Sequence, residues 1–167
     1  MILTIWRHGE AGRAPTDRER ELTDSGRDDV GFGCQQFHDA CSNRGIAHPG
    51  RILHSPFVRT NQTAEIIAAA FSHATRTWMD ALHPGSDVDA VDQALIDIVD
   101  GEAAHKHVLL VSHQPLISYI LGHYLGDPGA VPALSPGGLA TLSLDTPGKD
   151  CGRILFWAQP PEFEASV

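Results

Sequence analysis

The sequence predicts an α/β fold of three layers, in which a mainly parallel β-sheet is flanked by helices on both faces. Apolar strand-like runs alternate with segments of helical spacing, beginning with β-branched and aromatic residues at 2–6, and this order is typical of β-α-β units. The expected strand at 107–113 has the continuous apolar centre VLLV, as expected of a strand buried in a parallel sheet. Runs at 139–145 and 153–159 are separated by a Pro-Gly turn that suits a hairpin. The length of 167 residues suggests a single domain over 1–167.

The first helix is expected within residues 21–45. Thr23 or Asp24 could cap its start, because their side-chain oxygens can accept a hydrogen bond from the first turn. Two glycines, Gly31 and Gly33, weaken the helix by about 1 kcal/mol each. Apolar residues nevertheless recur at helical spacing, and they are Val30, Cys34, Phe37 and Cys41.

A short strand is expected at 51–55, and a helix follows it. Ser55 is a plausible N-cap of this helix, with Pro56 at the first helical position, where proline is favoured. The Ala-, Ile- and Glu-rich residues that follow favour a helix, and residues 76–79 could then form another strand.

Two further helices are expected at 86–100 and 114–125, on either side of the apolar strand at 107–113. The first of them carries an apolar stripe, which predicts that one face packs on the sheet. Its inward residues would be Val88, Val91, Leu95, Ile98 and Val99.

Composition limits the classes of partner. The formal net charge is −9 and the isoelectric point about 5.4, which argues against general binding to nucleic acid or anionic membranes. No apolar run approaches the length of a membrane span, and the first residues lack the basic region and cleavage site of a signal peptide. Three cysteines without a CxxC pair fit a reducing compartment. We therefore expect a cytoplasmic protein.

Positive charge is concentrated in the first part of the chain. Residues 1–60 hold eight of the twelve basic residues, and all eight are arginine. Arginine is suited to two-point contact with phosphate or carboxylate, although solvated surface arginines would give the same count. The eight are Arg7, Arg13, Arg18, Arg20, Arg27, Arg44, Arg51 and Arg59.

Chemistry-bearing residues follow three of the predicted strands. The first strand runs into Arg7 and His8, the second into a helix that bears Arg59, and the apolar strand into His113. Ligands of open parallel sheets bind beyond the carboxyl ends of the strands, so these residues should lie at one edge. Each alone has an ordinary explanation, such as a turn histidine or a solvated arginine. Their convergence is more specific than any one of them.

This set fits phosphoryl transfer through a histidine. A neutral imidazole is a competent nucleophile near pH 7, and its attack on phosphorus would give a phosphohistidine. Arg7, Arg59 and a protonated His113 could surround the transferred group with positive charge. We expect no cofactor and no metal site, because the HKH segment at 105–107 has no neighbouring ligand cluster. Phosphate-loop, dinucleotide and serine-hydrolase motifs are also missing.

Three motifs in order resemble those of the histidine phosphatase superfamily, also called phosphoglycerate mutase-like. They are RHGE at 7–10, SPFVRTNQTAEII at 55–67 and VSHQP at 111–115. The resemblance implies that His8 is the residue that becomes phosphorylated. It also implies that Arg7, Arg59 and His113 bind the phosphoryl group, and that the fold is phosphoglycerate mutase-like.

Within that superfamily the chain resembles the short SixA-type phosphohistidine phosphatases. The similar segments are RELTDSG at 20–26, LHPGSDVDAV at 82–91 and the LSPGGLATLSLD ending, and the overall length also fits. This resemblance implies that Arg20 lies near the phosphate.

The sequence also departs from the superfamily pattern. The loop EAGRAPTDR lacks the usual asparagine, and no insertion is long enough to cap the site. The nearest candidate for the usual acidic proton donor is Asp87, although its position favours the N-cap of the helix that follows. A site with a weak general acid would lose less of its reaction rate on phosphohistidine than on phosphoserine, because imidazole leaves more easily than an alcohol. An open site would also admit a histidine presented on a protein surface.

The sequence therefore predicts a phosphohistidine phosphatase that acts on a phosphorylated histidine of a phosphotransfer protein through a covalent intermediate. One alternative is a general phosphomonoesterase acting on metabolites or sugar phosphates. Another is a non-catalytic module that binds phosphohistidine. The expected partner is a phosphorylated protein, with neither nucleic acid nor membrane.

Overall fold

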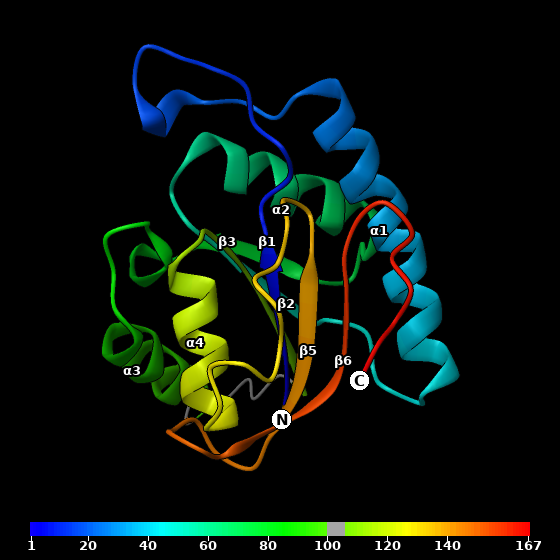
Figure 1. Ribbon diagram of the computed structural model, residues 1–167, viewed down its shortest axis with the longest axis vertical. Helices are drawn as coiled ribbons and strands as arrows, with labels where there is room; N and C mark the ends of the chain where they lie inside the picture. Colours follow the sequence, from blue (N-terminus) through cyan, green and yellow to red (C-terminus); the bar gives the residue numbers. More distant parts are fainter. Residues whose placement is uncertain (100–105) are drawn as a thin grey trace.

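A six-stranded sheet with strand order β3-β2-β4-β1-β5-β6 forms the centre of the computed structural model, which describes residues 1–99 and 106–167 (Figure 1). Strands β3, β2, β4 and β1 are parallel, whereas β5 and β6 are antiparallel to their neighbours. The predicted mainly parallel α/β fold and its C-terminal hairpin are therefore confirmed. The strands are β1 (Ile2–Arg7), β2 (Arg51–His54), β3 (Thr75–Trp78), β4 (His107–Ser112), β5 (Leu139–Leu144) and β6 (Gly152–Ala158).

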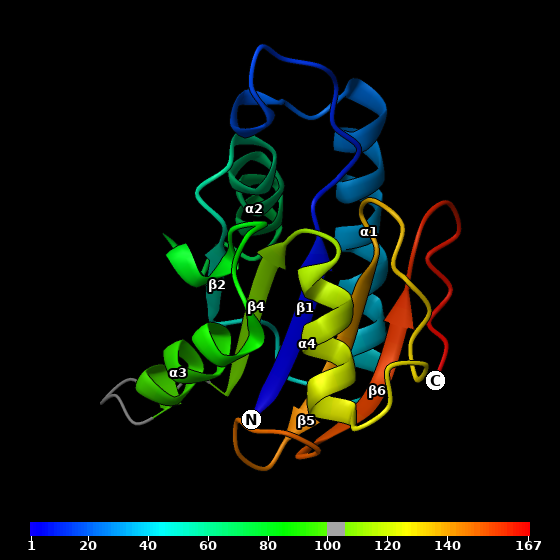
Figure 2. The ribbon, with the colours of Figure 1, turned by 60° about the vertical axis from the view of Figure 1, so that its left-hand side comes forward.

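Helices cover both faces of the sheet, which gives the predicted three layers. Helices α1 (Asp24–Asn43) and α2 (Val58–Ala70) lie on one face, and α3 (Val88–Val99) and α4 (Leu116–Leu125) lie on the other (Figure 2). Each face has its own apolar cluster with the helices that cover it. Two short 3-10 helices, η1 (Asp17–Glu19) and η2 (Asp80–Leu82), lie in the connections.

Strand β1 lies inside the sheet, between β4 and β5. Its side chains alternate between the two apolar clusters, because Leu3 and Ile5 pack on one face and Trp6 on the other. The register pairs Arg7 with Ser112 and His54 with Val111. The carboxyl ends of β1, β2 and β4 are therefore level at one edge.

The start of α2 differs from the prediction. The helix begins at Val58, and Phe57 occupies the N-cap position without a side-chain hydrogen bond. Instead, the Thr60 hydroxyl is 2.8 Å from the carbonyl oxygens of both Ser55 and Phe57 and can donate to either. Ser55 is thus not the helix cap, and its hydroxyl is within reach of His113.

The caps and stripes of the other helices are mostly as predicted. Thr23 caps α1, since its hydroxyl accepts a hydrogen bond from the Gly26 amide at 3.0 Å. In α3, Val91 and Leu95 are buried, but Val99 is 36% exposed, contrary to the prediction. Val99 is the last residue of α3, and this end of the helix lies at the margin of the molecule (Figure 2). Asp100, which was expected to end the helix, lies outside the described residues.

The two glycines inside α1 should respond in opposite ways to replacement by alanine. A Cβ at Gly31 would have no atom within 4 Å, whereas a Cβ at Gly33 would lie 2.6 Å from the ring of Phe163. We expect Gly31→Ala to raise the free energy of unfolding by about 0.5–1 kcal/mol through helix propensity. Gly33→Ala should lower it by about 1–3 kcal/mol, because the ring must move. Urea unfolding of the two variants checks this, and equal shifts would contradict it.

Candidate active site

A cavity of about 370 Å³ lies at the edge where β1, β2 and β4 end. Three separate segments supply its predicted residues, as expected of this edge of a parallel sheet. Five of the six residues singled out in the sequence line it, and they are Arg7, His8, Arg20, Arg59 and His113.

The loop after β1 is held in place by close backbone packing. A Cβ at Gly9 would lie 2.8 Å from the Gly26 carbonyl oxygen, and a Cβ at Gly26 would clash with the carbonyl oxygen of Glu10. The loop therefore packs on the first turn of α1, where only glycines fit. The Gly9 amide also donates to the Thr63 hydroxyl of α2 at 3.1 Å. These contacts fix the backbone that carries His8.

His8 is buried with one ring nitrogen available as a nucleophile. Its Nδ1 lies 2.8 Å from the Gly9 carbonyl oxygen, which can only accept, so Nδ1 carries the proton. Its Nε2 accepts a hydrogen bond from Arg59 Nε at 3.1 Å. Burial lowers the pKa of His8 to about 4, the Gly9 carbonyl opposes this, and nearby arginines add to the lowering. His8 is therefore neutral at pH 7, with its lone pair on Nε2.

His113 packs beside His8, with 5.1 Å between the ring centroids. Its Nε2 lies 2.8 Å from the Ser55 hydroxyl, and its buried Nδ1 has no partner within the described part of the chain. Burial, followed by the neighbouring His8 and Arg59, lowers the pKa of His113 to about 2. His113 is therefore neutral in the free site, because burial and the adjacent arginine penalise a further cation, and its protonation beside a transferred phosphoryl group stays a prediction.

Arg59 is the central cation of the cavity and is only 4% exposed. Its Nε donates to His8, while Nη1 donates to the Asp17 carbonyl at 2.6 Å and Nη2 to the Asp17 carboxylate at 3.1 Å. The Phe57 ring lies 5.1 Å from its Cζ. A solvated surface arginine is thus excluded at this position.

Carbonyl oxygens orient the other two guanidinium groups. Arg7 Nη1 donates to Leu134 O at 2.7 Å, and its buried Nε lacks a partner in residues 1–99 and 106–167. Arg20 Nε donates to Gly12 O at 2.8 Å, and its Nη2 donates to a second loop carbonyl. Neutral oxygens orient both groups without cancelling their charge, and Arg20 Nη1 pairs in addition with the Asp17 carboxylate at 3.2 Å.

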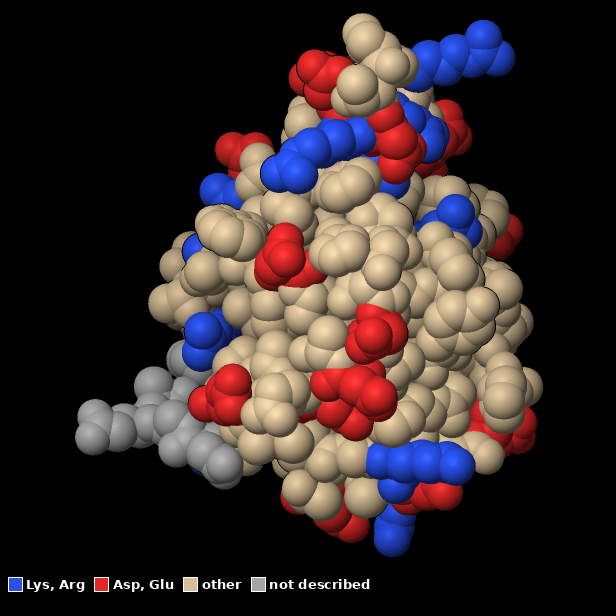
Figure 3. Space-filling model, turned by 90° about the vertical axis from the view of Figure 1, so that its left-hand side faces the viewer, with Lys and Arg blue, Asp and Glu red and all other residues tan. Residues whose placement is uncertain are grey.

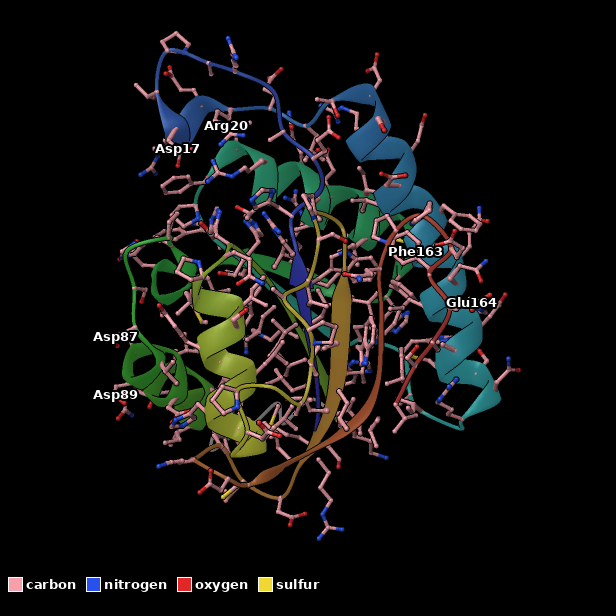
Figure 4. The ribbon with its side chains drawn as sticks, viewed as in Figure 1. Asp17, Arg20, Asp87, Asp89, Phe163 and Glu164 are labelled. Carbon is pink, nitrogen blue, oxygen red and sulfur yellow. The ribbon has the colours of Figure 1, made fainter. Side chains whose placement is uncertain are left out.

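Asp17 is a cavity residue that sequence reasoning missed. Its carboxylate accepts from Arg59 at 3.1 Å and from Arg20 at 3.2 Å, and Figure 4 shows Asp17 and Arg20 side by side above the sheet. Desolvation acts to raise the pKa of Asp17, but hydrogen bonds from both arginines outweigh it and hold that pKa below its usual range. An anion therefore already contacts two of the arginines. The spacing of Asp17 and Arg20, three apart in a short loop, was the signal available in the sequence.

Asp87 is not among the residues that line the cavity. Its carboxylate accepts a hydrogen bond from the Ala90 amide at 2.9 Å, and Figure 4 shows it beside Asp89 at the start of α3, away from Asp17. The structure therefore favours the helix cap over the proton donor. The carboxylates that do line the cavity belong to Glu10 and Asp17.

The described residues contain neither a cluster of metal ligands nor a helix suited to span a membrane. No group of three histidine, cysteine or acidic side chains is arranged there to hold a metal ion, and His105 of the HKH segment lies outside that part of the chain. None of the described helices is both long and apolar enough to cross a membrane.

Curated relatives match the sequence over most of its length. The chain is 29% identical over 165 residues to a "Phosphohistidine phosphatase SixA homolog" of Haemophilus influenzae, covering 96% of this chain and 97% of that protein. It is 28% identical to the phosphohistidine phosphatase SixA of Escherichia coli, over 89% of this chain and 88% of that protein. No family model matches the sequence.

Solved structures share the fold. The protein histidine phosphatase SixA, solved with tungstate, superposes with a TM-score of 0.75 at 27% identity, covering 96% of this chain and 97% of that one. A phosphoglycerate mutase of Plasmodium falciparum shares the fold at a TM-score of 0.67 and 18% identity, over 99% of this chain and 92% of that one. In sequence and fold the chain is therefore similar to SixA-type phosphohistidine phosphatases of the histidine phosphatase superfamily.

Proposed function

We propose that this protein is a phosphohistidine phosphatase that removes the phosphoryl group from a histidine of another protein. The observation that carries the proposal is His8, a buried neutral imidazole whose unprotonated Nε2 accepts a hydrogen bond from the Arg59 guanidinium group. The names of its relatives in Haemophilus influenzae and Escherichia coli support the same activity. The finer proposal is that the substrate histidine belongs to a phosphotransfer domain.

In the first step, His8 Nε2 attacks the phosphorus atom. The bond between phosphorus and the substrate imidazole breaks, and that imidazole leaves and takes a proton from water. Arg59 Nε, which donates to His8 Nε2 in the free site, then turns to a phosphoryl oxygen, and Arg7 and Arg20 bind the others. The product is phosphorylated His8 and a free substrate histidine.

The Asp17 carboxylate bears on the choice of leaving group. It is ionised and paired with Arg59 and Arg20, so it is a poor proton donor. Arg59 Nη2 and Arg20 Nη1 donate to this carboxylate, so they can bind a phosphoryl oxygen once the carboxylate moves aside. An imidazole leaving group tolerates the lack of an acid better than an alcohol does. In the second step water attacks phosphorylated His8, releasing inorganic phosphate and restoring the free imidazole.

Phosphate release from three substrates tests the proposal. They are a phosphotransfer domain phosphorylated on histidine, a phosphoserine protein and p-nitrophenyl phosphate, each at matched concentration. We expect phosphate to be released fastest from the phosphotransfer domain. Equal or faster release from the other two would favour a general phosphomonoesterase. Binding of the phosphorylated domain without release would favour a non-catalytic module.

A further inference from the structure

A second hollow, of about 470 Å³, lies next to the catalytic cavity. It is bounded by η1, by the connection from β2 to α2, and by the end of β3. We call it the Trp78 groove, and its lining residues used below are Arg18, Pro56, Val58, Trp78 and Asp80. It has a larger volume than the cavity that contains His8.

The Phe57 ring connects the groove with the catalytic cavity. The Cζ atom of Arg18, which lines the groove, lies 5.7 Å from the centre of this ring. Arg59 Cζ and the His113 ring, which belong to the cavity, each lie 5.1 Å from the same centre. A large molecule whose phosphoryl group reached His8 would therefore have its neighbouring surface over the groove.

Trp78 presents a large apolar surface to solvent in this groove. It ends the edge strand β3 and is 60% exposed, next to the half-buried Pro56 and Val58. By contrast, Trp6 is fully buried in the core. Exposed tryptophans at the centre of an apolar hollow are the residues that most often dominate the affinity of protein interfaces.

The charges at the rim indicate the chemistry of the partner. The Arg18 side chain is exposed and forms no ion pair within residues 1–99 and 106–167. Figure 3 views this side of the molecule and shows basic and acidic side chains intermixed along its upper part, with separate acidic side chains on the area below. The protein has a net charge of −9, but Arg18 places at the rim of the groove a positive charge that is unpaired among the described residues. This charge favours a carboxylate on the partner. Asp80, which also lines the groove, would repel a carboxylate placed beside it.

We propose that the Trp78 groove is the docking surface for the protein that carries the phosphohistidine. An apolar side chain close to the phosphohistidine packs against Trp78, Pro56 and Val58, and a neighbouring carboxylate pairs with Arg18. This inference rests on the proposed function and adds the surface that selects a protein over a small phosphorylated molecule.

The test compares a protein substrate with a small one. The probes are a phosphotransfer domain phosphorylated on histidine with phosphoramidate, and free phosphohistidine. We expect Trp78→Ala to lower kcat/KM for the domain about tenfold or more, mainly through KM, and to leave free phosphohistidine unchanged. Arg18→Ala should lower kcat/KM for the domain by a smaller factor, and this loss should become smaller at high salt. The matched control is Tyr119→Ala, because Tyr119 is 61% exposed and lies on α4 outside the groove.

The outcomes separate docking from activity. The docking proposal alone would be overturned if the wild-type protein hydrolysed both probes and Trp78→Ala had the same kcat/KM as wild type for the domain. Equal losses on both probes would also overturn it, since Trp78 would then act on the catalytic cavity itself. Wild-type protein inactive on both probes would overturn the proposed function, and the docking inference with it. Thermal unfolding of each variant shows whether it is folded, and Trp78→Phe should keep most of the activity on the domain.

Discussion

Replacing His8 by alanine should abolish phosphate release from a phosphohistidine protein and prevent labelling of the enzyme. The imidazole is the nucleophile in the proposed mechanism, and the remaining arginines can bind the phosphoryl group but cannot accept it. Loss of a nucleophile commonly costs on the order of 10⁴–10⁶ in kcat. Single-turnover reaction with a phosphotransfer domain carrying a radioactive phosphoryl group measures both effects. Label that is stable to base and labile to acid identifies phosphohistidine.

A second buried histidine supplies the control for this variant. Burial lowers the pKa of His107 to about 4, as it does for His8, but His107 begins β4 and does not line the cavity. Its Nε2 lies 2.8 Å from the Thr4 hydroxyl. His107→Gln should therefore lower stability and leave labelling intact. Labelling of His8→Ala at the wild-type level would exclude His8 as the nucleophile.

Local sequence signals were sufficient to predict much of the site. One apolar strand runs into Arg7 and His8, and another ends before His113. The common position of these three residues was predicted correctly because strand ends in a parallel sheet share an edge. The glycine after His8 was also informative, since a Cβ there would meet the Gly26 carbonyl. These features depend on short stretches of chain and on one topological rule.

Contacts between distant segments were beyond sequence reasoning. Asp17 lies 42 positions from Arg59, and its own sequence neighbourhood reads as an ordinary polar loop. Ser55 looked like a helix cap because Ser-Pro often starts a helix, yet its hydroxyl lies against His113. The neutral state of His113 depends on burial and on Arg59, which are properties of the assembled site. The charge of each group therefore had to come from the structure.

Arg59→Ala should lower kcat/KM for a phosphohistidine protein by about 10²–10³-fold, equivalent to about 2.7–4 kcal/mol of transition-state stabilisation. Arg59 is fixed before substrate arrives, since its three nitrogens are held by His8 and Asp17. A donor in place needs little reorganisation as charge develops on the phosphoryl oxygens. Arg59→Lys should recover only part of the loss, because an ammonium group cannot replace the planar fork. Steady-state kinetics with the phosphorylated domain measures all three proteins.

The Asp17 contact makes that result ambiguous unless a second variant accompanies it, because Arg59→Ala also releases η1. Asp17→Asn removes the charge pairing and keeps Arg59 with its donors. If Arg59 acts as a phosphoryl ligand, Asp17→Asn should stay within about tenfold of wild type, and inorganic phosphate should inhibit it more strongly, since a competing anion is gone. A loss in Asp17→Asn as large as in Arg59→Ala would instead mean that Arg59 acts by anchoring η1. This pair of variants therefore separates two roles of Arg59, that of a phosphoryl ligand and that of an anchor for η1.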